Sequence, residues 1–323
     1  MLTELTASVQ KSLEKIEQTI AQSLRTDNLF VQQMVDYLAH SSGKRVRPAL
    51  ALLSARYCGK NAEEAVVLGA ALEMIHVATL IHDDIIDNSA VRRKQKTLNF
   101  KWGNEISVLM GDYVFASSFY LMAKNLPKGV LSALSDTTNI ICRGEISETF
   151  HRFNVRLTED QYLEVVRDKT ASLFAASCQT GAMLAEAGPK TVEMLHRFGM
   201  GVGMAFQVID DTLDFTGRQS KVGKPVMADL REGKLTLPVI YCLRACSAAE
   251  KKKVQKIILK KVKTPADFKF LSGLLKKTKA IEYSIQKARS YVAEAKAALY
   301  ALNGSRDKND LLQFAEFLAR RDF

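Results

Sequence analysis

The chain has 323 residues, 47% of them hydrophobic and 25% charged, so it can bury a sizeable core and is neither a disordered chain nor a mini-protein. Because its net charge is +11, a polyanionic partner such as nucleic acid or an anionic membrane has to be considered. Apolar residues recur at helical spacing in nearly every segment, and alternating β-branched runs are scarce. We therefore predict an all-α protein in which residues 1–323 form a single domain of ten or more helices.

Residues 1–24 form the first predicted helix. Lys11, Glu14, Lys15 and Glu17 are spaced amphipathically, so the segment lacks the uncharged core of a signal peptide. The cysteines are odd in number, contain no CxxC pair and lie in apolar helical stretches, which indicates reduced thiols. They are Cys58, Cys142, Cys178, Cys242 and Cys246. A reducing, cytoplasmic location is predicted.

The string GKRVRP, residues 43–48, is the next feature along the chain. Lys44, Arg45 and Arg47 offer a concentrated set of donors, and Pro48 is expected to start a helix. Such a string is usually a surface turn. It becomes a diphosphate site only if other anion-binding residues lie nearby, because planar guanidinium groups bind phosphate through paired donors.

The segment 65–82 is predicted to be a helix that is apolar on nearly all sides. Glu73 is its only acidic or basic residue apart from histidine, so the helix is expected in the middle of the bundle. A membrane span is disfavoured, because Glu73, His76 and the aspartates that follow would be costly in lipid.

The stretch LIHDDIID, residues 80–87, ends this helix with three aspartates, Asp83, Asp84 and Asp87, the first acidic motif. At about 100° per residue, His76, Asp83 and Asp87 fall within roughly 20° of one direction. Carboxylates one turn apart repel, and ionised groups in an apolar cleft require a cation. A cation is therefore expected at this helix end, and an arginine pair, Arg92 and Arg93, follows it.

The same spacing recurs in FQVIDDTLDF, residues 206–215, after another apolar run. Asp210, Asp211 and Asp214 form the second acidic motif and share a helical face with Gln207. Carboxylates without thiolate or clustered imidazole suit Mg²⁺, which commonly completes its shell with phosphate oxygens. We predict that both motifs face one central cleft.

Two other interpretations of these motifs were weighed. A single DDxxD is more often a solvated helix end or an N-cap, but two copies after apolar helices make that reading unfavourable. An EF-hand is excluded, because neither stretch has the alternating ligands, central glycine and terminal glutamate of that loop.

Much of the positive charge lies in residues 251–279, which are rich in lysine and poor in arginine. The segment lacks the arginine forks and interleaved aromatic residues of nucleic-acid sites, so no nucleic-acid partner is predicted. A solvated amphipathic face is favoured, and contact with an anionic membrane surface is the alternative.

Together these motifs resemble the trans-isoprenyl diphosphate synthases of the polyprenyl synthetase family. The resemblance runs from about Gly43 to the C-terminal LARRDF, and its strings occur in the family's order: GKRVRP, EMIH, LIHDDIID, RR, GDY, GE, DKT, FQVIDDTLDF and GKPVMADLREGKLTLP. It implies the isoprenoid synthase fold and a Mg²⁺-dependent prenyltransferase. Such an enzyme elongates an allylic diphosphate with isopentenyl diphosphate.

The resemblance also implies roles for individual residues. Lys44, Arg47, His76 and Arg93, with the adjacent Arg45 as a further donor, would hold isopentenyl diphosphate. The allylic diphosphate would contact Arg92, Lys169, Thr170, Gln207, Lys224 and Lys234. Both acidic motifs would hold the magnesium cluster. The predicted catalytic set is Asp83, Asp84, Asp87, Lys169, Asp210 and Lys234.

The chain departs from the family pattern at three places. Lys94 and Lys96 stand where glycine and proline usually follow the arginine pair. Glu148 replaces a common glutamine, and Met227 with Ala228 replaces a stretch that usually contains glycine. None of these changes removes a predicted metal ligand.

Product length is predicted from Ala78 and Thr79. Thr79 lies one helical turn, about 6 Å, before Asp83, where the growing tail must pass. Aromatic residues at these two positions give short products in the family, so a long all-trans product, hexaprenyl to decaprenyl, is predicted. A farnesyl or geranylgeranyl product is the alternative, with Phe119 or Met122 as a deeper floor.

Two rival functions were weighed. A terpene cyclase usually carries Asn and Ser or Thr ligands in its second motif and lacks the basic string, and a noncatalytic partner subunit would be expected to have lost one acidic motif. The resemblance further implies a homodimer. Peripheral membrane contact for product release and an auxiliary subunit are left open.

Overall fold

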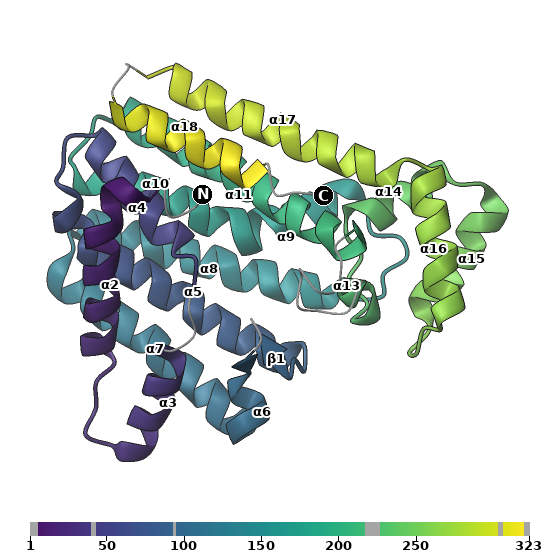
Figure 1. The fold of residues 1–323 in the computed structure, drawn as a ribbon, viewed down its shortest axis with the longest axis horizontal. Coiled ribbons are helices and arrows are strands. Elements are labelled where there is room, and N and C mark those ends of the chain that lie inside the picture. The colour runs from purple at the N-terminus through teal and green to yellow at the C-terminus, as the bar shows by residue number, and fades with distance from the viewer. Residues whose placement is uncertain (1–5, 40–42, 93–94, 217–226, 303–305, 320–323) are drawn as a thin grey trace. The chain divides into compact units, whose positions relative to one another are not determined.

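The computed structural model describes residues 6–39, 43–92, 95–216, 227–302 and 306–319. These residues are almost entirely helical, as predicted (Figure 1). They belong to two compact units, each described separately below. Unit 1 comprises Met1–Thr138, Leu173–Gly199 and Ala298–Phe314, and unit 2 comprises Asn139–Ser172, Met200–Ala297 and Ala315–Phe323. The single-domain organisation stays a prediction.

Unit 1 is built around α5. Short 3₁₀ turns, Ala7–Val9 and Ala62–Ala65, precede α2 and α5. The helices are α2 (Gln10–Ser23), α3 (Leu29–Ala39), α4 (Val46–Tyr57), α5 (Val66–Ile86), α6 (Leu98–Trp102), α7 (Asn104–Asn125), α10 (Ser172–Leu184) and α18 (Arg306–Ala319). Met74 and Ala78 of α5 pack with Met110 and Val114 of α7 in one apolar cluster. The predicted buried helix is therefore confirmed.

The acidic side chain in the middle of α5 is neutralised by an arginine from the basic string. Glu73 is 3% exposed, and its Oε1 accepts a hydrogen bond from Arg45 Nη1 at 2.6 Å. Arg45 Nη2 also donates to Glu17 Oε2 of α2 at 2.9 Å. Removing one partner of such a pair leaves an uncompensated buried charge, so this contact fixes Arg45 between α2 and α5.

The basic string itself folds differently from the expectation in one respect. Helix α4 begins at Val46 rather than at Pro48, and Arg45 precedes it with φ of 47° in the left-handed region. Few residues adopt that conformation without local support. The two ion pairs of Arg45 supply the support.

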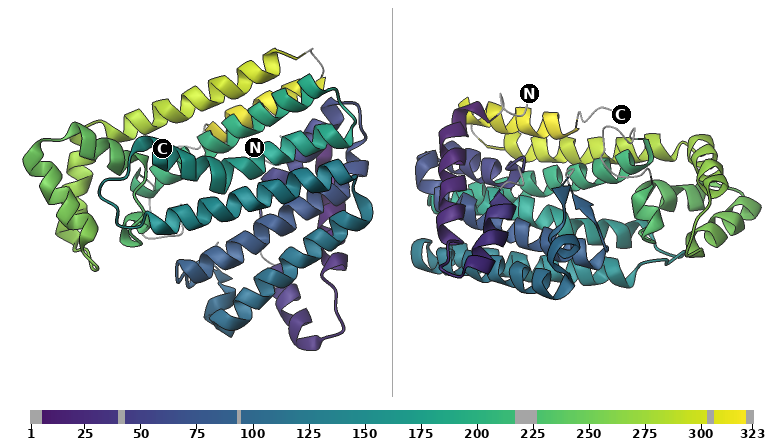
Figure 2. Two further views of the ribbon diagram at one scale, coloured as in Figure 1. Left: turned by 180° about the vertical axis from the view of Figure 1, so that it is seen from behind. Right: turned by 60° about the horizontal axis from the view of Figure 1, so that its bottom comes forward.

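Unit 2 contains shorter helices. They are α9 (Glu159–Val166), α13 (Ala228–Arg231), α14 (Leu237–Ala245), α15 (Ala248–Leu259) and α16 (Pro265–Lys277), with a π-helical turn at Arg167–Ala171. Helices α15 and α16 lie side by side (Figures 1 and 2). Capping boxes at Ser247 and Thr264 start them. Their inner faces bury Val254, Ile258 and Leu271 in the core of unit 2.

Three long helices contribute residues to both units: α8 (Lys128–Phe150), α11 (Pro189–Thr216) and α17 (Ala280–Tyr300). Helix α10 does so through Ser172, and α18 does so from Ala315 onward. A small antiparallel hairpin was not predicted. Its strands are β1 (Val91–Arg92) and β2 (Gln95–Lys96), with Arg92 opposite Gln95. Lys94 lies outside the described residues.

Two segments, Ala62–Ile86 and Asn104–Asn125, are long and apolar enough to cross a membrane by length and composition alone. The most apolar window of the first is 67% buried within the protein, as expected for a core helix. That of the second is 33% buried, and α7 exposes Leu109 and Tyr120. All five cysteines are free thiols, and Cys142 on α8 is exposed.

Candidate active site

The first acidic motif lies at the C-terminal end of α5. Asp87 caps the helix, Asn88 turns away with φ of 49°, and Ser89 N donates to Asp84 O at 2.9 Å. This left-handed closure is a common way to end a helix. The carboxylates therefore sit at the negative end of the helix dipole, where anions are disfavoured. The N-cap interpretation is wrong for this motif, and the need for a cation is stronger than the sequence indicated.

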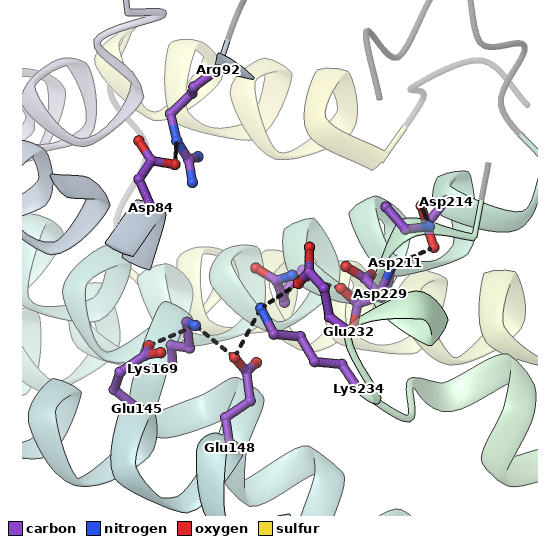
Figure 3. A network of polar contacts seen from close by, with 12 residues as sticks. Asp84, Arg92, Glu145, Glu148, Lys169, Asp211, Asp214, Asp229, Glu232 and Lys234 are labelled. Carbon is purple, nitrogen blue, oxygen red and sulfur yellow. Dashed lines mark hydrogen bonds and ion pairs between the residues drawn. The ribbon is translucent and has the colours of Figure 1, made fainter. Parts of the chain in front are cut away.

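One aspartate of the motif is already paired. Asp84 is 7% exposed, and its Oδ1 accepts a hydrogen bond from Arg92 Nε at 2.7 Å (Figure 3). Arg92 comes from β1, and Asn99 Nδ2 also donates to the backbone oxygen of Asp84. Asp83 and Asp87 are half-buried on the helical face that also carries His76. Within this motif, these two side chains retain access to solvent.

The basic string divides into two kinds of residue. Lys44 is exposed, and the guanidinium of Arg47 lies 4.6 Å from the ring centre of Phe174. Stacking on an aromatic face holds a guanidinium plane in place and leaves its edge able to donate. Arg45, predicted with them to bind substrate, is instead held by Glu17 and Glu73. Arg93 lies outside the described residues.

The second acidic motif lies in the last turns of α11, also at a C-terminal helix end. Asp210 is exposed, whereas Asp211 is 7% exposed. Asp211 Oδ2 accepts a hydrogen bond from the hydroxyl of Tyr162 at 2.5 Å, and its Oδ1 accepts one from Gln207 Nε2 at 2.6 Å. Gln207 Oε1 in turn accepts from Thr170 Oγ1 at 3.0 Å. Gln207 thus contacts the carboxylate of Asp211 directly and links Thr170 to it.

The environment of Asp211 makes its ionised form unfavourable. Burial raises the pKa of its carboxyl to about 7, while the donors Tyr162 and Gln207 oppose that rise and the nearby Asp210 and Glu148 add to it. Burial, together with the charge of Asp211, also raises the pKa of Tyr162 well above its usual value, so its hydroxyl stays a donor. Tyr162 was missed from the sequence, because a tyrosine on an amphipathic helix resembles any core position.

Asp214 has a different role from its neighbours. It is 9% exposed, and its carboxylate accepts hydrogen bonds from the backbone N–H groups of Ala228 and Asp229 at 3.0 and 3.3 Å. These groups open α13, so Asp214 binds a helix N-terminus. Met227 precedes them with φ of 59°, a conformation that suits the glycine expected there. Lys224 lies outside the described residues.

The π-helical turn Arg167–Ala171 carries two predicted substrate-binding residues, Lys169 and Thr170. Such turns are rare and are common at functional sites. Its backbone lies against α8: a Cβ on Gly144 would be 2.5 Å from Lys169 N. This close approach explains the glycine of the GE string.

Two of the three predicted allylic-site lysines share one carboxylate partner (Figure 3). Lys169 Nζ lies 2.6 Å from Glu145 Oε2 and 2.8 Å from Glu148 Oε2. Lys234 Nζ lies 3.5 Å from Glu148 Oε2 and 3.1 Å from Glu232 Oε2. Glu148, the replacement for glutamine, therefore joins both lysines. Apart from the departure from the family pattern, nothing in the sequence indicated this arrangement.

The predicted chain-length residues lie on α5 against α7. Ala78 is fully buried in the cluster with Met110 and Val114. Thr79 is half-buried, and its hydroxyl donates to the backbone oxygen of His76 at 2.8 Å. On α7, Phe119 is half-buried and Met122 is fully buried. The role of Ala78 and Thr79 in product length stays a prediction.

The donor set fits a hard divalent ion that arrives with its substrate. Within the ranges that the structure describes, no three His, Cys, Asp or Glu side chains are gathered closely enough to hold a metal ion on their own. Magnesium is usually bound by one or two carboxylates together with phosphate oxygens. Asp83 and Asp87 in unit 1, and Asp210 in unit 2, offer carboxylates of that kind.

Comparison with known proteins gives consistent matches. Residues 28–275 match the family model described as Polyprenyl synthetase. The chain is 35% identical over 312 residues to "Heptaprenyl diphosphate synthase component 2" of Bacillus subtilis (strain 168), covering 96% of this chain and 88% of that protein.

Two solved structures are similar over nearly their whole lengths. A decaprenyl diphosphate synthase from Rhodobacter capsulatus has a TM-score of 0.94 at 33% identity and covers 99% of both chains. A polyprenyl synthase from Caulobacter crescentus CB15, complexed with calcium and isoprenyl diphosphate, has a TM-score of 0.94 at 31% identity. That match covers 99% of this chain and 98% of the other.

Proposed function

Because the chain belongs to the polyprenyl synthetase family, we propose that it is a Mg²⁺-dependent prenyltransferase that elongates an allylic diphosphate with isopentenyl diphosphate. The observation that carries this proposal is the placement of two DDxxD motifs at the negative ends of two apolar helices. Such a placement is unfavourable for a protein without a cation. The family is divalent-metal dependent in general, and the choice of Mg²⁺ rests on the all-oxygen donor set.

The proposed reaction separates the allylic diphosphate from its hydrocarbon, after which the alkene of isopentenyl diphosphate attacks the allylic cation and a proton is lost. Bound Mg²⁺ would supply stabilisation of the leaving diphosphate. Asp83 and Asp87 would hold such ions at the first acidic motif, and Asp210 would hold one at the second. Lys169 and Lys234 would donate to the departing diphosphate oxygens. Lys44 and Arg47 would orient isopentenyl diphosphate, so that the reacting carbons meet.

We assign a long all-trans product, hexaprenyl to decaprenyl. Ala78 and Thr79 support this assignment, because neither side chain is large enough to block the space one turn beyond Asp83. The printed names of the similar proteins, heptaprenyl and decaprenyl diphosphate synthase, agree with it. A farnesyl or geranylgeranyl product is the alternative, with Phe119 or Met122 as the floor.

We also propose that the enzyme is a cytoplasmic homodimer. The exposed side of α7 supports the dimer, since Val108 is 40%, Leu109 64% and Tyr120 63% exposed, and contiguous apolar surface marks interaction sites. The name "component 2" belongs to a relative that has another component. Prenyltransferase activity of the purified chain alone would show that no auxiliary subunit is needed. Activity that appears only after cell extract is added would show that one is.

The central test is removal of one carboxylate from each motif. Asp83→Ala and Asp210→Ala should each lower turnover by roughly two decades or more, because each removes charge that neutralises the diphosphate. Incorporation of labelled isopentenyl diphosphate measures the effect. Asp136→Ala on the exposed side of α8 is the matched control and should retain normal turnover. Near-normal turnover in either motif variant would contradict the proposal.

The second prediction concerns Tyr162, which we assign as a positioning residue for Asp211. Tyr162→Phe removes a hydrogen bond to a carboxylate, worth about 1.5–3 kcal/mol, so kcat should fall about tenfold or more. The Mg²⁺ concentration at half-maximal rate should rise as well. A purely structural role would lower thermal stability without moving the Mg²⁺ dependence.

The third prediction concerns the acid that joins the two lysines. Glu148→Gln removes a negative charge 2.8 Å from Lys169 Nζ, so KM for the allylic diphosphate should fall by about threefold or more. KM for isopentenyl diphosphate should stay unchanged. Glu164→Gln on α9 is the control. A higher allylic KM would show that Glu148 assists substrate binding instead of competing with it.

The fourth prediction concerns product length. Thr79→Phe places a ring one turn beyond Asp83 without changing a proposed metal ligand, so products should shorten while the first condensations continue. Chromatography of the dephosphorylated products measures the distribution. Thr79→Ser is the control of similar size. An unchanged distribution in an active, folded Thr79→Phe protein would rule out this position as a length determinant.

A further inference from the structure

Most of the net charge of this protein is concentrated in the hairpin of α15 and α16. Residues 248–279 contain eleven lysines against two acids, Glu250 and Asp267, and so carry nine of the chain's eleven net positive charges. Neither the proposed reaction nor the core of unit 2 uses these lysines. The hairpin therefore needs a separate explanation.

The two acids of the hairpin already have partners within it. Asp267 accepts from Lys260 Nζ at 2.7 Å, and Glu250 accepts from Lys277 Nζ at 2.7 Å. These pairs join the two helices near opposite ends, which fixes the hairpin. Most of the remaining lysines are exposed and make no ion pair with any residue that the structure describes: Lys251, Lys252, Lys256, Lys261, Lys269 and Lys276. They form an uncompensated basic surface.

Two large apolar side chains lie among these lysines at the connection between the helices. Leu259 ends α15 and is 58% exposed, and Val262 in the turn is 82% exposed. Lys252, Lys256 and Leu259 lie on one face of α15, because they are four and then three residues apart in the helix. Lys260 and Lys261 stand between Leu259 and Val262. The tip thus combines exposed apolar groups with flanking cations.

We propose that this hairpin is a docking surface for an anionic lipid bilayer. Exposed Leu and Val would enter the interface between headgroups and acyl chains while the flanking lysines bind acidic headgroups, as in other peripheral anchors. Each lysine near an anionic bilayer strengthens binding about fivefold, an effect that salt weakens. This docking is separate from the proposed reaction. Under the proposed function, it would place the enzyme next to the bilayer into which a long apolar product partitions.

The chemistry of the hairpin favours lipid over nucleic acid. Residues 248–279 contain no arginine, and the rings of Phe268 and Phe270 are half-buried under Arg231 and Lys253 at 4.1 and 3.8 Å. No stacking face is thus presented by these rings, although bases would need one. Leu259 and Val262 would also have no partner on a phosphate backbone.

The test is sedimentation of the full-length protein with vesicles, without substrate. Vesicles of phosphatidylcholine should leave it in solution, whereas vesicles containing one third phosphatidylglycerol should bind it, and added salt should weaken that binding. The variant Lys252→Glu/Lys256→Glu/Lys261→Glu should lose at least tenfold in affinity. The variant Leu259→Ser/Val262→Ser should lose severalfold at unchanged charge.

A matched control has the same net charge as the triple variant. Lys11→Glu/Lys128→Glu/Lys190→Glu changes three exposed lysines outside the hairpin and should bind vesicles nearly as the wild type does. Circular dichroism checks that every variant is folded. Equal losses in the control and hairpin variants, no binding to anionic vesicles, or tighter binding to a short RNA than to vesicles would each overturn the proposal. Because no substrate is present, these outcomes are independent of prenyltransferase activity.

Discussion

The accumulation of carboxylates at the C-terminal ends of α5 and α11 is the constraint on which the rest of the site depends. The helix dipole already places partial negative charge there, and the turns that lead into both motifs are largely apolar, so solvent cannot fully screen the added acids. A fold under selection for stability alone would avoid this placement. The surrounding residues are best understood as the means by which the protein tolerates it.

The two motifs tolerate the charge in different ways, although their spacing is the same. The second aspartate of each motif, Asp84 or Asp211, is 7% exposed. Asp84 is paired with the fixed positive charge of Arg92, whereas among the described residues the hydrogen-bond donors to Asp211 are the neutral groups of Tyr162 and Gln207. That difference explains why burial raises the pKa of Asp211 to about 7.

The sequence predicted what periodicity and local spacing control. The central burial of α5 and the acidic helix ends both follow from patterns within one or two turns. The sequence did not predict contacts between residues far apart in the chain. Arg45 contacts Glu17 and Glu73, each 28 residues away, and Tyr162 contacts Asp211, 49 residues away. An arginine beside two candidate ligands and a tyrosine on an amphipathic helix carry no local mark of such partners. Deriving them requires knowing which helices meet.

The charge around Lys169 and Lys234 has a consequence for what can bind there. Three glutamates, Glu145, Glu148 and Glu232, surround two lysines, so their formal charges sum to a negative value. A diphosphate without metal ions would have to take the lysines away from their glutamate partners. The glutamates would then face the negatively charged diphosphate, and like-charge repulsion opposes that arrangement. A diphosphate that carries divalent metal ions has most of its charge neutralised, and it meets no such penalty. Under the proposed function, the lysines therefore recognise the metal complex of the allylic diphosphate rather than the free anion, and the glutamates reject the free anion.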